Sequence, residues 1–268
     1  MELIILGSGG ASPTPKPFCQ CLACKKARKL GEPYKRNSSS LFIKDINAVV
    51  DCGEDIADSL NRRDIKTIDN LFITHWHPDH TFGLRAVLQA NFNFLKNKNV
   101  HPINIYIPKK SYEILMEKFA AIDYFINVQK AGTLHLVDDG DNFQLGDINI
   151  SVVGYGGKGS DTCAYLIEHK SKKALYSPCD TISFARYKDF SNLDLLITEC
   201  GAFSHIPDEI SFKDMISRLR EIKPKKTIIT HIEEIELNAW GEKHFNDIKK
   251  QYADLKFDYT YDGMKIKL

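Results

Sequence analysis

The chain has 268 residues, 43% of them hydrophobic, which is enough for one large domain with a buried core. Its 36 lysines and arginines nearly balance 35 aspartates and glutamates, so no global basic field favours a nucleic acid or an anionic membrane as partner. We therefore expect a small-molecule substrate, with neither nucleic acid nor membrane as partner. A homodimer is compatible with the sequence.

Short β-branched runs alternate with amphipathic stretches along the chain, which predicts a mixed α/β fold. Strands are predicted at Leu3–Leu6, Leu41–Lys44, Ala48–Asp51, Leu71–Ile73, Ile103–Ile107, Leu134–Val137, Ile148–Val153, Cys163–Glu168, Lys173–Ser177, Leu193–Thr198 and Thr227–Thr230. Helices are predicted at Glu54–Arg63, Lys110–Ala121, Phe212–Ile222 and Glu242–Tyr252. No low-complexity linker interrupts these elements, so we expect a single domain over residues 1–268.

The N-terminal segment and the cysteines indicate in which cellular compartment the protein works. The segment Met1–Gly7 lacks a basic leader, and no apolar run reaches the roughly 18 residues that span a bilayer. We therefore expect a cytoplasmic protein. The seven cysteines are odd in number, and three of them crowd together as Cys19, Cys21 and Cys24. This spacing suits reduced thiols and a metal better than a disulfide framework.

The most informative segment is Thr74–His80, which holds three histidines and an aspartate directly after an apolar run. Side chains two positions apart in an extended backbone point the same way, so His75 and His77 can converge on one ion. Asp79 and His80 then turn toward a second ion. Imidazoles and carboxylates at this density are rare without a metal, and the segment therefore predicts a metal-activated hydrolase.

His75, His77, Asp79 and His80 match the HxHxDH signature of the metallo-β-lactamase superfamily, which the whole chain resembles. The resemblance implies an αββα sandwich, in which helices flank two mixed β-sheets and the metal site lies at the sheet edges. It adds to the α/β pattern already read from the residues.

Three further residues match later or earlier motifs of that superfamily. Val49–Gly53, with Asp51 at a strand end, resembles the first motif, and Tyr176–Asp180 looks like the strand whose aspartate bridges both metals. Thr230-His231 is similar to the segment with the last metal histidine. The resemblance thus implies that Asp180 and His231 are metal ligands. An acid and a histidine after apolar runs are also what such a ligand set needs.

A narrower resemblance involves the N-terminal segments Gly7–Pro13 and Cys19–Cys24 together with Tyr261–Met264. This combination looks like the branch that contains the phosphoribosyl cyclic phosphodiesterase of phosphonate breakdown. That branch holds a separate structural zinc on its CxCxxC loop, which implies structural Zn²⁺ on a Cys-rich loop at about residues 17–26 of this chain. Three thiolates on a short loop repel one another and gain by sharing a soft ion.

The fourth ligand of this zinc departs from the branch. The branch takes it from a histidine three residues after the last metal histidine, where this chain has Glu234. A carboxylate binds zinc, but a site with three thiolates and a carboxylate is unusual. A water or another side chain is the alternative.

Lys158 stands where the superfamily's third motif has a metal histidine. Three arrangements are open. His75, His77, Asp180 and a water hold the first ion; or Asp161 or a residue from elsewhere substitutes; or the Lys158 ammonium fills the region and only the second ion binds. An ammonium is a poor zinc ligand but a suitable cation for phosphate, and a solvated loop lysine is the plain alternative.

The function that we predict is metal-assisted hydrolysis of a small or cyclic phosphodiester, with one or two Zn²⁺ or Mn²⁺ ions in the active site. Asp79 and Lys158 are the predicted catalytic residues beside the ions. His205 is the predicted group near the leaving oxygen, with Glu209 as its alternative. Lys158 would stabilise charge on the phosphoryl oxygens.

Two other functions fit the same motifs. One is hydrolysis of a lactone, a thioester or RNA ends on the same fold, although the near-neutral charge argues against a transfer-RNA nuclease. The other is a degenerate, non-enzymatic binding protein, because the third-motif histidine is missing. Loss of turnover on chelation would separate an enzyme from a binding protein.

Overall fold

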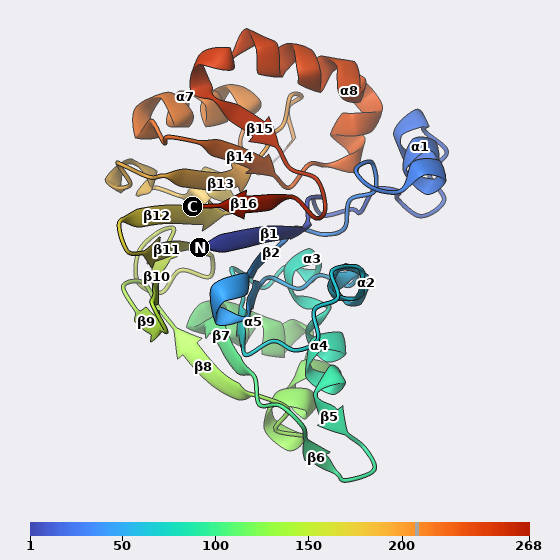
Figure 1. The fold of residues 1–268 in the computed structure, drawn as a ribbon, viewed down its shortest axis with the longest axis vertical. Helices are drawn as coiled ribbons and strands as arrows, with labels where there is room; N and C mark the ends of the chain where they lie inside the picture. The colour runs from blue at the N-terminus through green and yellow to red at the C-terminus, as the bar shows by residue number, and fades with distance from the viewer. Residues whose placement is uncertain (207–208) are drawn as a thin grey trace.

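The computed structural model describes residues 1–206 and 209–268. Two seven-stranded sheets face each other, and helices cover their outer sides (Figure 1). This is a four-layer αββα sandwich, so the predicted α/β class and architecture are confirmed. Among the described residues, no helix is both long enough and apolar enough to cross a membrane.

The first sheet is built mainly from the N-terminal half of the chain. Its strands, in spatial order, are β16 (Lys265–Lys267), β1 (Glu2–Gly7), β2 (Ser40–Ile43), β3 (Ala48–Val50), β4 (Asn70–Phe72), β7 (Asn104–Pro108) and β8 (Thr133–Val137). From β3 to β8 the strands run parallel. A short hairpin of β5 (Phe92–Asn93) and β6 (Lys98–Asn99) projects from the lower end in Figure 1.

The second sheet comes from the C-terminal half. Its strands, in spatial order, are β15 (Phe257–Tyr259), β14 (Thr227–Thr230), β13 (Leu195–Glu199), β12 (Lys172–Ser177), β11 (Cys163–His169), β10 (Ile148–Gly154) and β9 (Asn142–Leu145). From β12 to β15 the strands run parallel. Every residue of β13 and β14 is buried, which explains why these strands appear in the sequence as continuous apolar runs.

The helices pack outside the sheets or at their edges. They are α1 (Leu22–Leu30), α2 (Ile56–Arg62), α3 (Pro78–Thr81), α4 (Leu84–Ala90), α5 (Lys109–Lys118), α6 (Ala121–Asp123), α7 (Phe212–Ile222) and α8 (Glu234–Gln251). Single turns lie at Lys44–Ile46, Tyr124–Val128, Thr181–Ser183, Tyr187–Asp189 and Ala253–Leu255. Helices α2, α4 and α5 contribute to the apolar cluster on the first sheet, and α7 and α8 to the cluster on the second.

A third apolar cluster lies between the sheets. Tyr165 on β11 packs edge-on against Phe72 at the end of β4, and its hydroxyl donates to the Ile73 carbonyl at 2.7 Å. Burial of so much apolar side-chain area is the main free-energy gain that holds the sheets together. It also fixes the end of β4 against β11, next to the histidine segment.

The observed helices and strands differ from the predicted ones in several places. Helix α8 begins at Glu234 rather than Glu242, and Gly241 interrupts it with a φ of 68°. A glycine with positive φ breaks the helical pattern in the sequence, so only the second half was recognisable. Helix α1 in the Cys-rich segment was not predicted, because cysteines and lysines there give no clear apolar stripe. Helices α3 and α4 and strands β5, β6, β9, β15 and β16 were also missed.

Candidate metal centre

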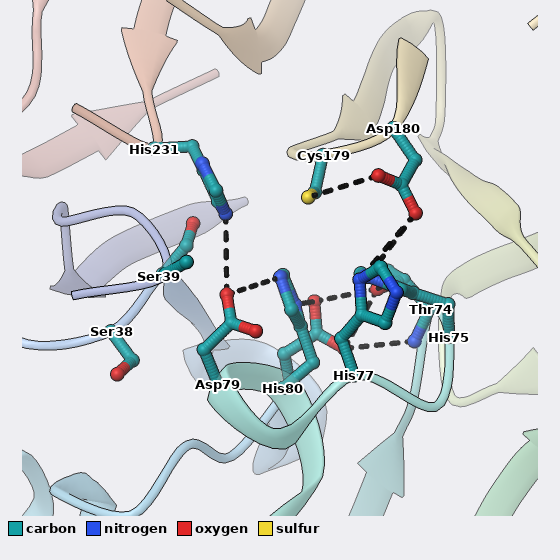
Figure 2. A network of polar contacts seen from close by, with 12 residues as sticks. Ser38, Ser39, Thr74, His75, His77, Asp79, His80, Cys179, Asp180 and His231 are labelled. Atoms are coloured by element: carbon teal, nitrogen blue, oxygen red, sulfur yellow. Dashed lines mark hydrogen bonds and ion pairs between the residues drawn. The ribbon is translucent and has the colours of Figure 1, made fainter. Parts of the chain in front are cut away.

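The candidate ligands follow the carboxyl ends of parallel strands in both sheets. Asp51 follows β3, His75 lies just beyond β4, and His231 follows β14. Because the carboxyl ends of parallel strands open on one edge, side chains placed there converge. Figure 2 shows the histidines and carboxylates from both sheets around one space. The candidate ligands from the two sheets thus meet at one edge, where the resemblance places the site.

Three of these residues adopt left-handed backbone conformations. The φ angles are 63° at Asp51, 54° at Asp180 and 53° at His231. Such angles are unfavourable for residues with a Cβ and cluster at functional sites, where the surrounding structure holds them in place. Here each one turns the chain sharply after a buried strand and aims a polar side chain across the edge.

Asp51 is buried and hydrogen-bonds both Thr74 and His80. Its carboxylate accepts a hydrogen bond from the Thr74 amide at 2.8 Å and from the Thr74 hydroxyl at 2.9 Å. Its Oδ2 lies 2.9 Å from Nδ1 of His80. With Nδ1–H donating to Asp51, the lone pair of His80 lies on Nε2, which points away from Asp51.

The first donor group comprises His75, His77 and Asp180. Nε2 of His75 lies 3.0 Å from Nδ1 of His77, and Oδ2 of Asp180 is 3.6 Å from each of these nitrogens. Nδ1 of His75 lies 3.0 Å from the Thr74 hydroxyl. The predicted pairing of His75 with His77 is thus present, and Asp180 from the second sheet joins them.

The second donor group comprises Asp79, His80 and His231. Oδ2 of Asp79 lies 3.1 Å from Nε2 of His80 and 3.3 Å from Nε2 of His231. The two imidazole rings are stacked with centroids 5.6 Å apart. Asp79 and His80 lie in the single turn of α3, which Pro78 starts at its first position.

The carboxylates around the second group favour positive charge on its histidines. Burial opposes ionisation of all three side chains, but the neighbouring imidazoles hold the pKa of Asp79 well below its usual value. Against the same burial, Asp79 and Asp51 raise the pKa of His80 well above its usual value. Asp79 and Glu233 likewise raise the pKa of His231 to about 10. A divalent cation would supply the charge that protons otherwise supply.

The donors fit a divalent metal. Within the described residues, Nε2 of His80 is buried and has no hydrogen-bond partner of acceptable geometry, although Asp79 lies close to it. A buried imidazole nitrogen without a partner is costly unless a cation binds it. Nitrogen and oxygen donors from six side chains suit Zn²⁺, and carboxylates among them also suit Mn²⁺.

The Cys-rich loop and Glu234 form a third group of donors, which shares no residue with the two groups at the sheet edge. The sulfur atoms of Cys19, Cys21 and Cys24 each lie 3.2 Å from Oε1 of Glu234. Glu234 is the first residue of α8, and Cys21 caps α1 by accepting from the Cys24 amide at 3.3 Å. The structure therefore brings together all four residues predicted for this site, with the carboxylate at the fourth position.

The protonation of this cluster depends on its burial. Burial raises the pKa of the Cys24 thiol, and the contact with Glu234 raises it further. Burial also opposes the charge on Glu234, but the thiols hydrogen-bonded to it leave its pKa below the usual value. Three soft thiols around one carboxylate oxygen are a suitable donor set for zinc.

The structure places the other predicted catalytic residues outside these two donor groups. Lys158 is exposed in the turn after β10, and His205 is exposed in the loop after β13. Glu209 is half-buried and lines a small cavity together with His231 and Glu233. Burial raises its pKa. Among the described contacts, neither Lys158 nor His205 touches a candidate ligand.

Sequence reasoning missed two carboxylates near the centre. Glu199 is buried at the end of β13 and accepts from the Thr181 amide at 2.5 Å; burial raises its pKa to about 7. Oε1 of Glu233 lies 3.4 Å from Nδ1 of His231. Glu199 ends an apolar run just as Asp51 does, and Glu233 follows His231 by two positions. Either feature was a readable signal.

Comparison with known proteins identifies the family. The sequence profile described as "Beta-lactamase superfamily domain" matches residues 46–232, which include both donor groups at the sheet edge. The match covers more than half of the chain. The chain belongs to the beta-lactamase superfamily. The membership inferred from the HxHxDH signature is therefore confirmed, while the Cys-rich loop and Glu234 lie outside the matched range.

Curated superfamily members with detectable similarity include ribonuclease Z proteins. Ribonuclease Z of Methanococcus aeolicus is 30% identical over 187 residues, covering 65% of this chain and 49% of that protein. Ribonuclease Z of Streptococcus gordonii is 42% identical over 87 residues, which are 30% of this chain and 28% of that protein. The chain thus spans about half the length, or less, of these curated relatives.

Solved structures of the superfamily match over the full chain. A diphosphatase of the PhnP family has a TM-score of 0.75 at 22% identity and covers 100% of this chain and 97% of its own. Zn²⁺-bound PqqB from Methylobacterium extorquens has a TM-score of 0.76 at 14% identity, with both chains covered completely. The short form of human tRNase Z has a TM-score of 0.63 at 19% identity, covering 100% and 99%. At these identities the matches establish the fold alone.

Proposed function

We propose that the protein is a metal-dependent phosphodiesterase that acts on a small or cyclic phosphodiester. The observation that carries the proposal is the pair of adjacent donor groups at one sheet edge. Within each group the donor atoms lie within 4.8 Å of one another, and the rings of His75 and His80 join the groups with centroids 4.2 Å apart. Two neighbouring cation sites suit hydrolysis of an anionic phosphodiester.

The chain's own residues would divide the work as follows. His75, His77 and Asp180 would hold one Zn²⁺ or Mn²⁺ ion, and Asp79, His80 and His231 the other. When bound, divalent ions lower the pKa of a water and offset the charge of the phosphate. Asp51 orients His80 through the 2.9 Å contact described above.

The remaining proposed roles concern the substrate. The Lys158 ammonium, exposed in a glycine-rich turn, would attract the anionic phosphate by its charge. His205 would protonate the leaving oxygen. Glu209, which shares a small cavity with His231, is the alternative group for this step.

For the Cys-rich loop we propose structural Zn²⁺ held by Cys19, Cys21, Cys24 and Glu234. The loop carries Phe18, which is 96% exposed, and so has little apolar core of its own. An ion shared by α1 and the start of α8 would tie the two helices together.

Cleavage of RNA ends is a second candidate function, favoured by the ribonuclease Z relatives. Both candidates require the same chemistry at phosphorus and differ in the size of the substrate. The near-neutral net charge of +1 favours the small phosphodiester, because RNA binding depends on a field of basic side chains.

One screen tests the proposal. Purified protein with added Zn²⁺ or Mn²⁺ is assayed on bis(p-nitrophenyl) phosphate, a ribose cyclic phosphate, p-nitrophenyl phosphate, a lactone, a β-lactam and a precursor transfer RNA. We expect the diesters to be hydrolysed fastest among the small substrates. His77→Ala and Asp79→Ala should each lower kcat/KM by about 100-fold or more, since even partners of metal ligands cost roughly 10–100-fold.

His101→Ala is the matched control, because His101 lies near the hairpin of β5 and β6 and pairs with Asp69, away from the donor groups. It should retain the activity of the unchanged protein. Faster hydrolysis of the lactone than of the diesters would reject the assignment, as would full activity in Asp79→Ala. Preference for the precursor transfer RNA would select the second candidate.

A further inference from the structure

Cys179 occupies a position that the superfamily motifs do not explain. It is buried between the end of β12 and Asp180, in the segment that aims Asp180 across the sheet edge. Its carbonyl accepts a hydrogen bond from the Tyr155 hydroxyl at 2.9 Å. Tyr155 is itself fully buried and stacks on Phe184 with ring centroids 4.4 Å apart. The backbone that carries the thiol is therefore rigidly held.

The thiol faces the metal centre. A donor atom of Cys179 lies within 4.8 Å of donor atoms of both His75 and His80, and all three side chains are buried. Its Sγ is 3.7 Å from Oδ1 of Asp180. Figure 2 shows the sulfur directed into the space above the histidine rings, between His231 and Asp180. One sulfur thus stands beside an imidazole from each donor group.

An independent observation marks the same space as a ligand position. Nε2 of His80 is completely buried; within the described part of the chain no group makes a well-formed hydrogen bond to it, and its near neighbour is the anionic Oδ2 of Asp79 at 3.1 Å. Nδ1 of the same ring is already bonded to Asp51 at 2.9 Å. Nε2 is consequently the nitrogen that is available to a cation, and it belongs to the ring that Cys179 faces.

We propose that Cys179 is a thiolate ligand of the active-site metal centre, placed between the two donor groups beside His75 and His80. The metal–sulfur bond forms as the thiol proton passes to solvent. A sulfur donor makes the centre softer and favours Zn²⁺ or Co²⁺ over Mn²⁺. This inference rests on the proposed metal centre and specifies which ions it prefers.

Other buried cysteines show that burial alone does not place a thiol here. Cys163 on β11 is equally buried, yet within the described residues it joins no group of potential metal donors. Its sulfur instead lies 4.0 Å from the Ile73 carbonyl. Cys163 is therefore a matched control for the loss of a buried thiol.

Cobalt spectroscopy tests the inference. The protein is first washed with a mild chelator, and the zinc retained by the Cys-rich loop is counted. Co²⁺ is then added, and near-ultraviolet absorption from thiolate-to-cobalt charge transfer is recorded. We expect this band in the unchanged protein and in Cys163→Ser. Cys179→Ser should lose it, bind Co²⁺ roughly 10–100-fold more weakly, and discriminate less between Zn²⁺ and Mn²⁺.

The outcomes separate this inference from the proposed function. If the unchanged protein, with one zinc still on the loop, binds cobalt without showing the band, this result would overturn the Cys179 assignment. It does not depend on whether Cys179→Ser folds. Equal cobalt binding by the unchanged protein and by His77→Ala would show that His77 holds no ion. That result would reject the proposed metal centre and, with it, the phosphodiesterase proposal. Retention of the full band in Cys179→Ser also overturns the assignment.

Discussion

The carboxylate of Asp51 and the imidazole of His80 form a completely buried pair, with Oδ2 of the aspartate 2.9 Å from Nδ1 of the histidine. Asp51 also accepts from the amide and hydroxyl of Thr74. One carboxylate thus joins the ends of β3 and β4 to α3. It fixes both the ring orientation of His80 and the start of the histidine segment, so the fold and the candidate metal site depend on the same contact.

Asp51→Asn should weaken metal binding more than it weakens folding. An asparagine retains one acceptor oxygen but no longer carries the charge that makes His80 a basic ligand. We expect about 10–100-fold weaker Zn²⁺ binding at the active site, measured by competition with a coloured chelator. Thr74→Val, which removes one donor to Asp51, should give a smaller loss. Unchanged zinc affinity in Asp51→Asn would show that the buried pair serves folding alone.

The Cys-rich loop predicts a second, separable class of zinc. Cys21→Ser should remove the zinc that survives mild chelation and lower the melting temperature by about 5 °C, because the loop and α1 lose their link to Glu234. Glu234→His should retain that zinc. Cys200→Ser, a buried thiol outside the cluster, is the control for thiol loss. If Cys21→Ser keeps the same zinc content and melting temperature, the site has no structural role.

Asp55 gives a pH prediction that is independent of the metals. Burial raises the pKa of Asp55 to about 6, and its carboxylate accepts from the Ser38 amide at 3.0 Å. A folded-state pKa above the unfolded value of about 3.9 means that protons favour folding, so this stability is complete below pH 4 and lost as pH rises through about 6.

Asp55→Asn should therefore stabilise the protein at pH 8 by about 1–2 kcal/mol, a value reduced from the full shift because Asp55 is only partly buried. The gain should vanish near pH 4, where the unchanged aspartate is protonated. Urea unfolding at both pH values measures this difference. The compared quantity is the free energy of unfolding of Asp55→Asn minus that of the unchanged protein. A smaller difference at pH 8 than at pH 4 would contradict the raised pKa of Asp55.

Much of the site was predictable because its residues follow recognisable strands. His75, His77, Asp79 and His80 form one local motif, and the apolar run before His231 marks a buried strand whose end must lie at an edge. These regularities are local, so the sequence was enough to group His75 with His77 and, with the superfamily resemblance, to place the candidate ligands at the sheet edge.

The remaining features depend on three-dimensional packing. Cys179 faces the centre only because β12 lies beside β11 and Asp180 turns with a positive φ. The kink at Gly241 hides the first half of α8, including the environment of Glu234. The strand neighbours of Cys179 and the contact of Glu234 with the Cys-rich loop arise between segments far apart in the chain, so no local pattern encodes them.

Lys158 allows a direct test of how the substrate is recruited. The ammonium is exposed in a turn whose neighbours Gly157 and Gly159 have φ angles of 89° and 77°. If it binds the phosphate, Lys158→Ala should raise KM about 5-fold, close to 1 kcal/mol for one exposed charge-assisted contact, and leave kcat nearly unchanged. Lys158→His should raise metal occupancy beside His75 and His77, because an imidazole is a ligand and an ammonium is not. Lys170→Ala, at an exposed position in the turn after β11, controls for the loss of one positive charge. Equal KM values for Lys158→Ala and Lys170→Ala, measured at low ionic strength, would return Lys158 to the role of an ordinary surface lysine.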